Sequence, residues 1–102
     1  MKTIVKHPGH PAHFAHVPNT LEGLQSVVDG YIETVTISPD LVMICNEEGF
    51  LRHLPDNCQV CGMRIVGTFI LAGVNGDKFD DVPLSQEDAE LLFPEMFQEG
   101  KS

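Results

Sequence analysis

The segment from Gly30 to Gly73 constrains the fold most, because runs of strand-forming residues alternate there with turn sequences. Runs 31–37 and 65–74 are rich in Val, Ile and Thr, whose branched side chains favour strands. Run 41–45 is almost wholly apolar, which predicts a central strand covered on both faces. The segment therefore predicts the middle of a β-sheet.

Turn chemistry divides these runs. Ser38-Pro39-Asp40 separates the first two, and Asn46-Glu47-Glu48-Gly49 follows the second. Phe50 and Leu51 are expected to begin a short return strand, and residues 54–62 to be irregular. Gly67 interrupts the last run, which predicts a bulge or a close approach to its backbone. Asn75-Gly76 is a strong hairpin signal, so residues 77–82 are expected to return as an edge strand.

The N-terminal part predicts two strands and a helix. Residues 2–6 are β-prone, and residues 12–17 are expected to pair antiparallel with them after a turn rich in Pro and Gly. Asn19 is the expected helix cap, with Glu22 at the capping-box position and Gly30 as the left-handed residue that ends the helix. The apolar stripe of this helix comprises Leu21, Leu24, Val27 and Val28.

A second helix is expected to start at Ser85, with Asp88 three residues further on. Pro94 does not fit a helix interior, so this helix should end near Phe93. Its predicted apolar face comprises Ala89, Leu92, Phe93 and Met96. The order of elements predicts a single α+β domain over residues 1–102, with a mainly antiparallel sheet of five to six strands, two helices and a frayed tail at 98–102.

The charge of the chain restricts its partners. Fifteen acidic and six basic residues give a formal net charge of −9, which disfavours direct binding to nucleic acid. The sequence shows no secretory signal and no apolar run long enough to span a membrane. We therefore expect a cytoplasmic protein whose three cysteines are thiols or metal ligands rather than disulfides.

Cys58 and Cys61 form a C-x-x-C-G sequence that could supply two ligands to a zinc ion. The two alternatives are plain thiols and a redox pair, although a thioredoxin-like motif should open a helix. Cys45, His53 and the N-terminal histidines are the candidates to complete a zinc site. His7, His10, His13 and His16 recur every three residues, but the Pro-rich setting is not helical and does not place them on one face.

No catalytic constellation is visible. Glu47 and Glu48 are adjacent, so on extended backbone their carboxylates point apart and make a poor catalytic pair. No phosphate-binding loop and no nucleophile elbow is present. We therefore expect a binding protein rather than an enzyme.

Several short motifs resemble, in their order and spacing, a family of small proteins known only as a domain of unknown function. These motifs cover roughly residues 1–85: Gly30-Tyr31-Ile32-Glu33, Asn46-Glu47-Glu48-Gly49, Leu54-Pro55-x-Asn57 and Gly67-Thr68. Such proteins are carried by bacteriophages, plasmids and integrated elements of bacteria. The resemblance implies an accessory protein of a mobile element in the bacterial cytoplasm, and it implies no catalytic or binding residues.

The leading hypothesis is a homo-oligomeric binding protein that antagonises a host defence system. In one form it sequesters a nucleotide, with Arg52 and Arg64 on phosphate, Asn46 and Asn57 on the base or ribose, and Tyr31 or Phe50 stacking. Glu47 and Glu48 would then receive ligand hydroxyls. In the other form its acidic face contacts a host protein. The alternative is a zinc-stabilised interaction module built on Cys58 and Cys61. The turns at 46–49 and 54–57 are the expected working surface.

Overall fold

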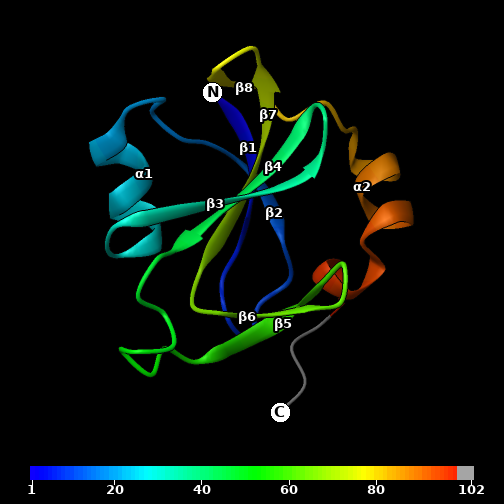
Figure 1. Cartoon of the computed structure of the whole chain (residues 1–102). Coiled ribbons are helices and arrows are strands. Elements are labelled where there is room, and N and C mark those ends of the chain that lie inside the picture. Colours follow the sequence, from blue (N-terminus) through cyan, green and yellow to red (C-terminus); the bar gives the residue numbers. More distant parts are fainter. Residues whose placement is uncertain (99–102) are drawn as a thin grey trace.

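The computed structural model describes residues 1–98, in which strands dominate and helices flank them (Figure 1). The elements are β1 (Lys2–Lys6), β2 (His13–His16), α1 (Leu21–Val28), β3 (Ile32–Ser38), β4 (Leu41–Asn46), β5 (Asp56–Val60), β6 (Met63–Val66), β7 (Phe69–Asn75), β8 (Lys78–Asp80), α2 (Gln86–Leu92) and the 3-10 helix η1 (Pro94–Phe97). The expected frayed tail at 98–102 lies outside the described residues except for Gln98.

Six strands form an antiparallel sheet in the order β2-β1-β7-β4-β3, with β8 also paired to β7. β1 pairs with residues 69–71 of β7 and β8 with residues 73–75, so the two strands follow each other along β7. β5 and β6 form a separate two-stranded sheet. This arrangement confirms the predicted α+β class and the mainly antiparallel sheet. No helix within residues 1–98 is long and apolar enough to cross a membrane.

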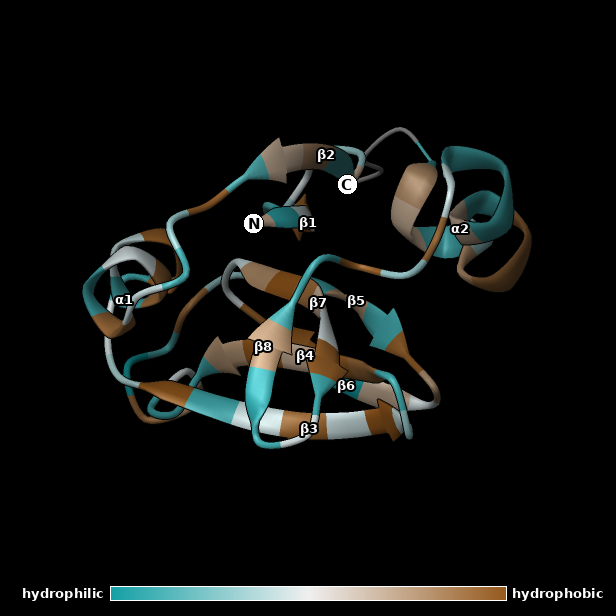
Figure 2. Ribbon diagram, turned by 90° about the horizontal axis from the view of Figure 1, so that it is seen from above, coloured by the Kyte–Doolittle hydropathy of each residue, from teal (hydrophilic) through white to brown (hydrophobic). Residues whose placement is uncertain are grey.

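The central strands of the large sheet, β1, β7 and β4, are buried on both faces, because their side chains alternate between two apolar clusters. Ile70 and Ala72 of β7 pack with Leu24 and Val28 of α1. Phe69 and Leu71 face the other cluster, which includes residues of α2, η1 and the β5–β6 hairpin. Figure 2 shows α1 and α2 on opposite sides of the sheet. All of β4 is buried between β3 and β7, which confirms the predicted central strand.

The ends of α1 differ from the prediction by one residue. Thr20, not Asn19, is the N-cap, and its hydroxyl oxygen accepts a 3.0 Å hydrogen bond from the Gly23 amide. Asn19 instead donates to the Phe79 carbonyl oxygen, which ties the helix start to β8. At the other end, Asp29 takes the left-handed conformation expected of Gly30, with φ of 61°. Leu21 of the predicted stripe is exposed.

The prediction for α2 is largely confirmed. The hydroxyl oxygen of Ser85 accepts a hydrogen bond from the Asp88 amide, and the helix ends where Pro94 begins η1. Ala89 and Met96 are buried as expected. Leu92 is not part of the apolar face, because 62 % of its surface remains exposed.

The region predicted to be irregular contains β5. Val60 pairs with Met63, so Cys61 and Gly62 form a two-residue hairpin turn with φ of 50° and 79°. Two consecutive positive φ angles are the mark of a type I′ turn. The sequence prediction was wrong here because this turn usually contains Asn, Asp or Gly, whereas Cys61 occupies its first position.

The predicted long strand 65–74 is divided at Gly67, where the chain passes from β6 to β7. A Cβ atom on Gly67 would lie 2.8 Å from Leu54 Cδ1, so the expected close approach is confirmed. The hairpin after β7 is confirmed, although its two-residue loop is Gly76-Asp77 and β8 is shorter than predicted. Phe50 and Leu51 lie in consecutive turns and form no strand, which corrects the expected return.

Candidate binding surface

A turn over residues 47–53, here called the 47–53 turn, connects β4 to the segment that leads into β5. Its backbone closes on itself: the Arg52 amide donates to the Glu48 carbonyl oxygen at 2.9 Å, and the Leu54 amide donates to Gly49 at 3.0 Å. The turn therefore has a defined shape made by its own main chain, although it contains no regular element.

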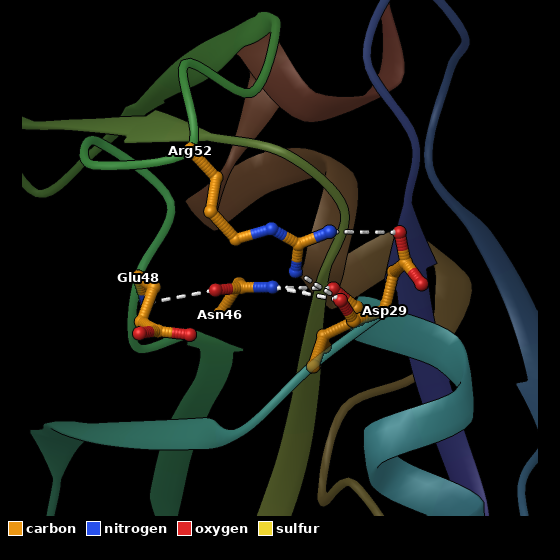
Figure 3. A network of polar contacts seen from close by, with 5 residues as sticks. Asp29, Asn46, Glu48 and Arg52 are labelled. Carbon is orange, nitrogen blue, oxygen red and sulfur yellow. Dashed lines mark hydrogen bonds and ion pairs between the residues drawn. The ribbon is translucent and has the colours of Figure 1, made fainter.

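Asn46, at the end of β4, fixes this turn to the end of α1. Its side-chain nitrogen donates to the carbonyl oxygens of Val28 and Asp29 at 3.0 and 3.1 Å. Its side-chain oxygen accepts from the Glu48 amide at 2.7 Å. Carbonyl groups at a helix C-terminus lack partners within the helix, so this buried amide satisfies two of them. Figure 3 shows the amide between the helix end and the turn.

Arg52 reaches the same helix end from inside the turn. Its Nη1 donates to the Asp29 carbonyl oxygen at 2.5 Å, and its Nη2 lies 3.5 Å from the Asp29 carboxylate (Figure 3). Gly30 makes this approach possible, because a Cβ atom there would lie 2.6 Å from Asn46 Nδ2 and 2.9 Å from Arg52 Nη1. The glycine that was expected to end the helix thus leaves room for the two side chains that hold the turn.

Three large side chains remain exposed at and beside the 47–53 turn. Phe50 and Leu51 lie in the turn and are 62 % and 82 % exposed. Tyr31 is 64 % exposed and adjoins the turn, because its carbonyl oxygen accepts from the Glu47 amide at 2.9 Å. These three residues, with Glu47 and Glu48, are called the turn surface below.

Arg64 of β6 lies beside the turn surface. Its Nε and Nη2 both donate to Asp56 Oδ1, at 3.1 and 2.6 Å, and its guanidinium lies 5.6 Å from the centre of the Phe50 ring. A shallow cavity of about 60 Å³ is lined by Glu47, Phe50, Arg64 and part of Asn46, among others. The structure thus brings together four of the eight predicted binding residues, with Tyr31, Glu48 and Arg52 close by along the chain.

Asn57, the eighth, belongs to a different arrangement. Its side-chain nitrogen donates to the carbonyl oxygens of Lys6 and Gly67, and its side-chain oxygen accepts from Lys6 Nζ at 2.9 Å. The Lys6 side chain is buried, and this burial lowers its pKa. Sequence reasoning missed Lys6, because a lysine in a short β-prone run gives no sign that its ammonium turns inward.

The two cysteines of the C-x-x-C-G sequence occupy unlike positions. Cys58 lies in β5, half-buried, where burial raises the pKa of its thiol, whereas Cys61 is exposed in the hairpin turn. Within residues 1–98, no three His, Cys, Asp or Glu side chains gather as metal ligands would. His7 and His13 do approach each other, with stacked rings 5.7 Å apart, and Thr68 Oγ1 lies 2.9 Å from His7 Nδ1.

Comparison with known proteins gives a family and no characterised relative. No curated protein and no solved structure matches the chain significantly. A family model described as a domain of unknown function, DUF3846, matches residues 1–98. Because this match spans nearly the whole chain, the protein belongs to the family of the domain of unknown function DUF3846.

Proposed function

We propose that this protein is a small accessory binding protein of a bacterial mobile element, and that it contacts a partner protein through the turn surface. The observation that carries the proposal is the exposure of Tyr31, Phe50 and Leu51 around one anchored turn. Aromatic residues such as Tyr and Phe are enriched at protein interfaces, where a few well-packed side chains provide most of the binding energy.

The anchoring of the turn supports this function. A loop that must be ordered on binding loses affinity to the entropy of ordering, whereas a loop already held in place avoids that cost. Asn46 and Arg52 hold the 47–53 turn against the end of α1 through four hydrogen bonds and a weak ion pair. Phe50 and Leu51 therefore project from a turn whose position is already fixed.

Contacts of the polar residues favour a protein partner over a nucleotide. Both predicted phosphate-binding residues, Arg52 and Arg64, already pair with carboxylates. The amides of Asn46 and Asn57 are engaged within the fold. The cavity of about 60 Å³ at the turn is also far below the roughly 300 Å³ at which small-molecule pockets begin.

The setting of the proposed function rests on the motif resemblance described above. A protein carried by a mobile element acts inside a bacterial host, so a host protein is the candidate partner and interference with host defence the candidate role. The net charge of −9 would speed association with a basic surface and slow it with an acidic one.

An affinity comparison in extract of a bacterial host tests the proposal. Proteins enriched on the wild-type chain are compared with those on the double variant Phe50→Ser/Leu51→Ser. Leu21→Ser, which removes an exposed leucine from α1, is the matched control. We expect a protein that binds wild type and Leu21→Ser, and whose purified form binds the double variant at least tenfold more weakly by calorimetry.

Equal affinity for the double variant would overturn the proposed surface. Titration of the same wild-type protein with cyclic and ADP-ribose nucleotides tests the alternative hypothesis, in which the protein sequesters a nucleotide. Heat release there, with no protein enriched in extract, would favour nucleotide sequestration instead.

A further inference from the structure

A groove separates the tip of the β5–β6 hairpin from the C-terminal helices. It has a volume of about 160 Å³, and its floor includes Val60 and Met96, each 1 % exposed. The hairpin contributes Cys61 and Gly62 to one wall, and the α2–η1 junction contributes Leu92 to the other. Figure 1 shows the hairpin tip beside η1, whereas the 47–53 turn lies at the opposite end of the hairpin.

Apolar side chains at the groove lack partners in the described part of the chain. Leu92 is 62 % exposed and Leu91, its neighbour on α2, is 74 % exposed. α2 is held to the core by Ala89, so both leucines sit on a helix whose position is already fixed. Of the two leucines, Leu92 lines the groove, above the nearly covered side chains of Val60 and Met96. An exposed leucine over such a floor suits contact with another apolar side chain.

The two helices beside the groove are acidic. α2 and η1 contain four carboxylates and no Lys, Arg or His: Glu87, Asp88, Glu90 and Glu95. Glu95 itself lines the groove. None of the four takes part in an ion pair with another described residue, since the ion pairs there join Arg52 to Asp29 and Arg64 to Asp56. The helical wall of the groove therefore carries negative charge that no ion pair with a described residue offsets.

We propose that this groove binds a basic amphipathic segment of a partner protein. One apolar side chain of the segment enters the groove between Cys61 and Leu92, and its flanking Lys or Arg residues face the carboxylates of α2 and η1. The proposal is independent of the turn surface and adds a second interaction surface at the other end of the hairpin.

Size and charge select this occupant. A volume of about 160 Å³ is below the roughly 300 Å³ typical of small-molecule pockets, and it suits a single large side chain. A second copy of this chain would bring another net charge of −9 against the same acidic face, so self-association there is opposed by repulsion. These carboxylates repel an acidic partner and attract a cationic one.

The test begins with selection of peptides from a random twelve-residue display library on the wild-type protein. We expect the selected peptides to combine Lys or Arg with a large apolar residue. Synthesised peptides are then titrated by fluorescence anisotropy. Leu92→Ser should weaken binding at least tenfold, whereas Leu21→Ser, an equivalent change on α1, should leave the dissociation constant within twofold of wild type.

Charge reversal gives a second, independent variant. Glu90→Lys/Glu95→Lys should weaken binding at least tenfold at low salt, and the loss should shrink as salt screens the charges. Glu22→Lys/Asp77→Lys, the same net change at exposed sites elsewhere, is the control. Circular dichroism confirms that each variant is folded.

Three outcomes would overturn the proposal. One is the selection of no peptides, or only of acidic or uncharged ones. Another is basic peptides whose affinity is unchanged by both groove variants. The third is a wild-type dimer in sedimentation equilibrium that Leu92→Ser dissociates, because the occupant would then be a second copy. Loss of peptide binding in Phe50→Ser/Leu51→Ser but not in the groove variants would place the peptide on the turn surface instead.

Discussion

The Lys6 ammonium donates a 2.9 Å hydrogen bond to the side-chain oxygen of Asn57, whose side-chain nitrogen donates back to the Lys6 carbonyl oxygen at 2.9 Å. This reciprocal pair joins β1 of the large sheet to β5 of the hairpin, across 51 positions in the sequence. Lys6 is only 4 % exposed, and its other side-chain bond goes to the His7 carbonyl oxygen. Both partners of this ammonium are neutral, so each of the two hydrogen bonds matters.

Asn57→Ala should therefore destabilise the protein by about 2–4 kcal/mol. The substitution leaves the Lys6 ammonium with one fewer acceptor and removes the donor from the carbonyl oxygens of Lys6 and Gly67. Urea unfolding followed by circular dichroism measures the change. Gln59→Ala, at an exposed position on the same strand, should cost no more than about 0.5 kcal/mol. Equal stability of the two variants would show that the Lys6–Asn57 pair does not hold the sheets together.

Asn46→Asp tests the anchor of the 47–53 turn with almost no change of shape. The new carboxylate keeps the acceptor for the Glu48 amide but places negative charge against the carbonyl oxygens of Val28 and Asp29. We expect a loss of about 2–4 kcal/mol at pH 7, because two donors are lost and a charge is buried.

The loss from Asn46→Asp should shrink as pH falls towards about 4 and stay small below it, because the buried carboxyl gains its proton in the folded chain first and can then donate one of the missing bonds. Thermal melts at pH 7 and pH 3.5 measure both effects. Asn75→Asp, at an exposed position, is the control for added charge alone. A melting temperature of Asn46→Asp that matches the control at pH 7 would mean that the turn is held by its backbone alone.

How far the sequence predicts this fold depends on whether the relevant signal is local. The apolar run 41–45 and the Ser85 cap can each be recognised from neighbouring residues alone, and both are confirmed. At the start of α1, Asn19 and Thr20 can each act as a cap, and the choice of Thr20 depends on the contact of Asn19 with Phe79, sixty residues away. The β5–β6 hairpin escaped prediction because Cys61 occupies a turn position that usually belongs to Asn, Asp or Gly.

The same limit applies to the candidate site. The turn chemistry of Asn46–Gly49 correctly predicted a turn after β4, and Phe50 is exposed in that turn. The side chains of Asn46 and Asn57, however, point into the protein. The side chain of a polar residue at the end of a strand can form its hydrogen bonds either with solvent or with a distant backbone group. The neighbouring sequence does not determine which of the two it does.

Comparing alanine substitutions at two glycines with similar φ angles distinguishes the cost of backbone strain from the cost of steric conflict. Gly62 and Gly67 have φ of 79° and 75°, so Ala at either position costs about 1 kcal/mol in strain. A Cβ atom at Gly62 meets nothing within 4 Å, whereas at Gly67 it would lie 2.8 Å from Leu54 Cδ1. Gly67→Ala should therefore destabilise the protein by about 1 kcal/mol more than Gly62→Ala in urea unfolding.

Shortening Leu54 identifies the source of that difference. In a Leu54→Ala background, the cost of Gly67→Ala should fall to that of Gly62→Ala, because the conflicting methyl group is gone. An undiminished cost in the double variant would assign the effect to the backbone at the junction of β6 and β7 rather than to Leu54.

The ionisation of the Cys45 thiol should lower the free energy of unfolding as pH rises through the alkaline range. Burial, with a smaller contribution from the Glu33 carboxylate, raises its pKa from 9.0 to about 11. Well below pH 9 the thiol is protonated in both the folded and the unfolded chain, so the free energy of unfolding is unaffected. Between pH 9 and 11 the unfolded chain loses this proton while the folded chain keeps it, so stability falls as pH rises.

Urea unfolding between pH 8 and 11 should show wild type losing about 2 kcal/mol more than Cys45→Ala over this range. Other groups that titrate there, including Lys6 and Cys58, are present in both proteins and cancel in the comparison. Cys45→Ala should be less stable than wild type at pH 8, because it leaves a small gap in the core, and the two curves should converge as pH rises. Parallel curves for wild type and Cys45→Ala would show that Cys45 ionises as readily in the folded chain as in the unfolded one.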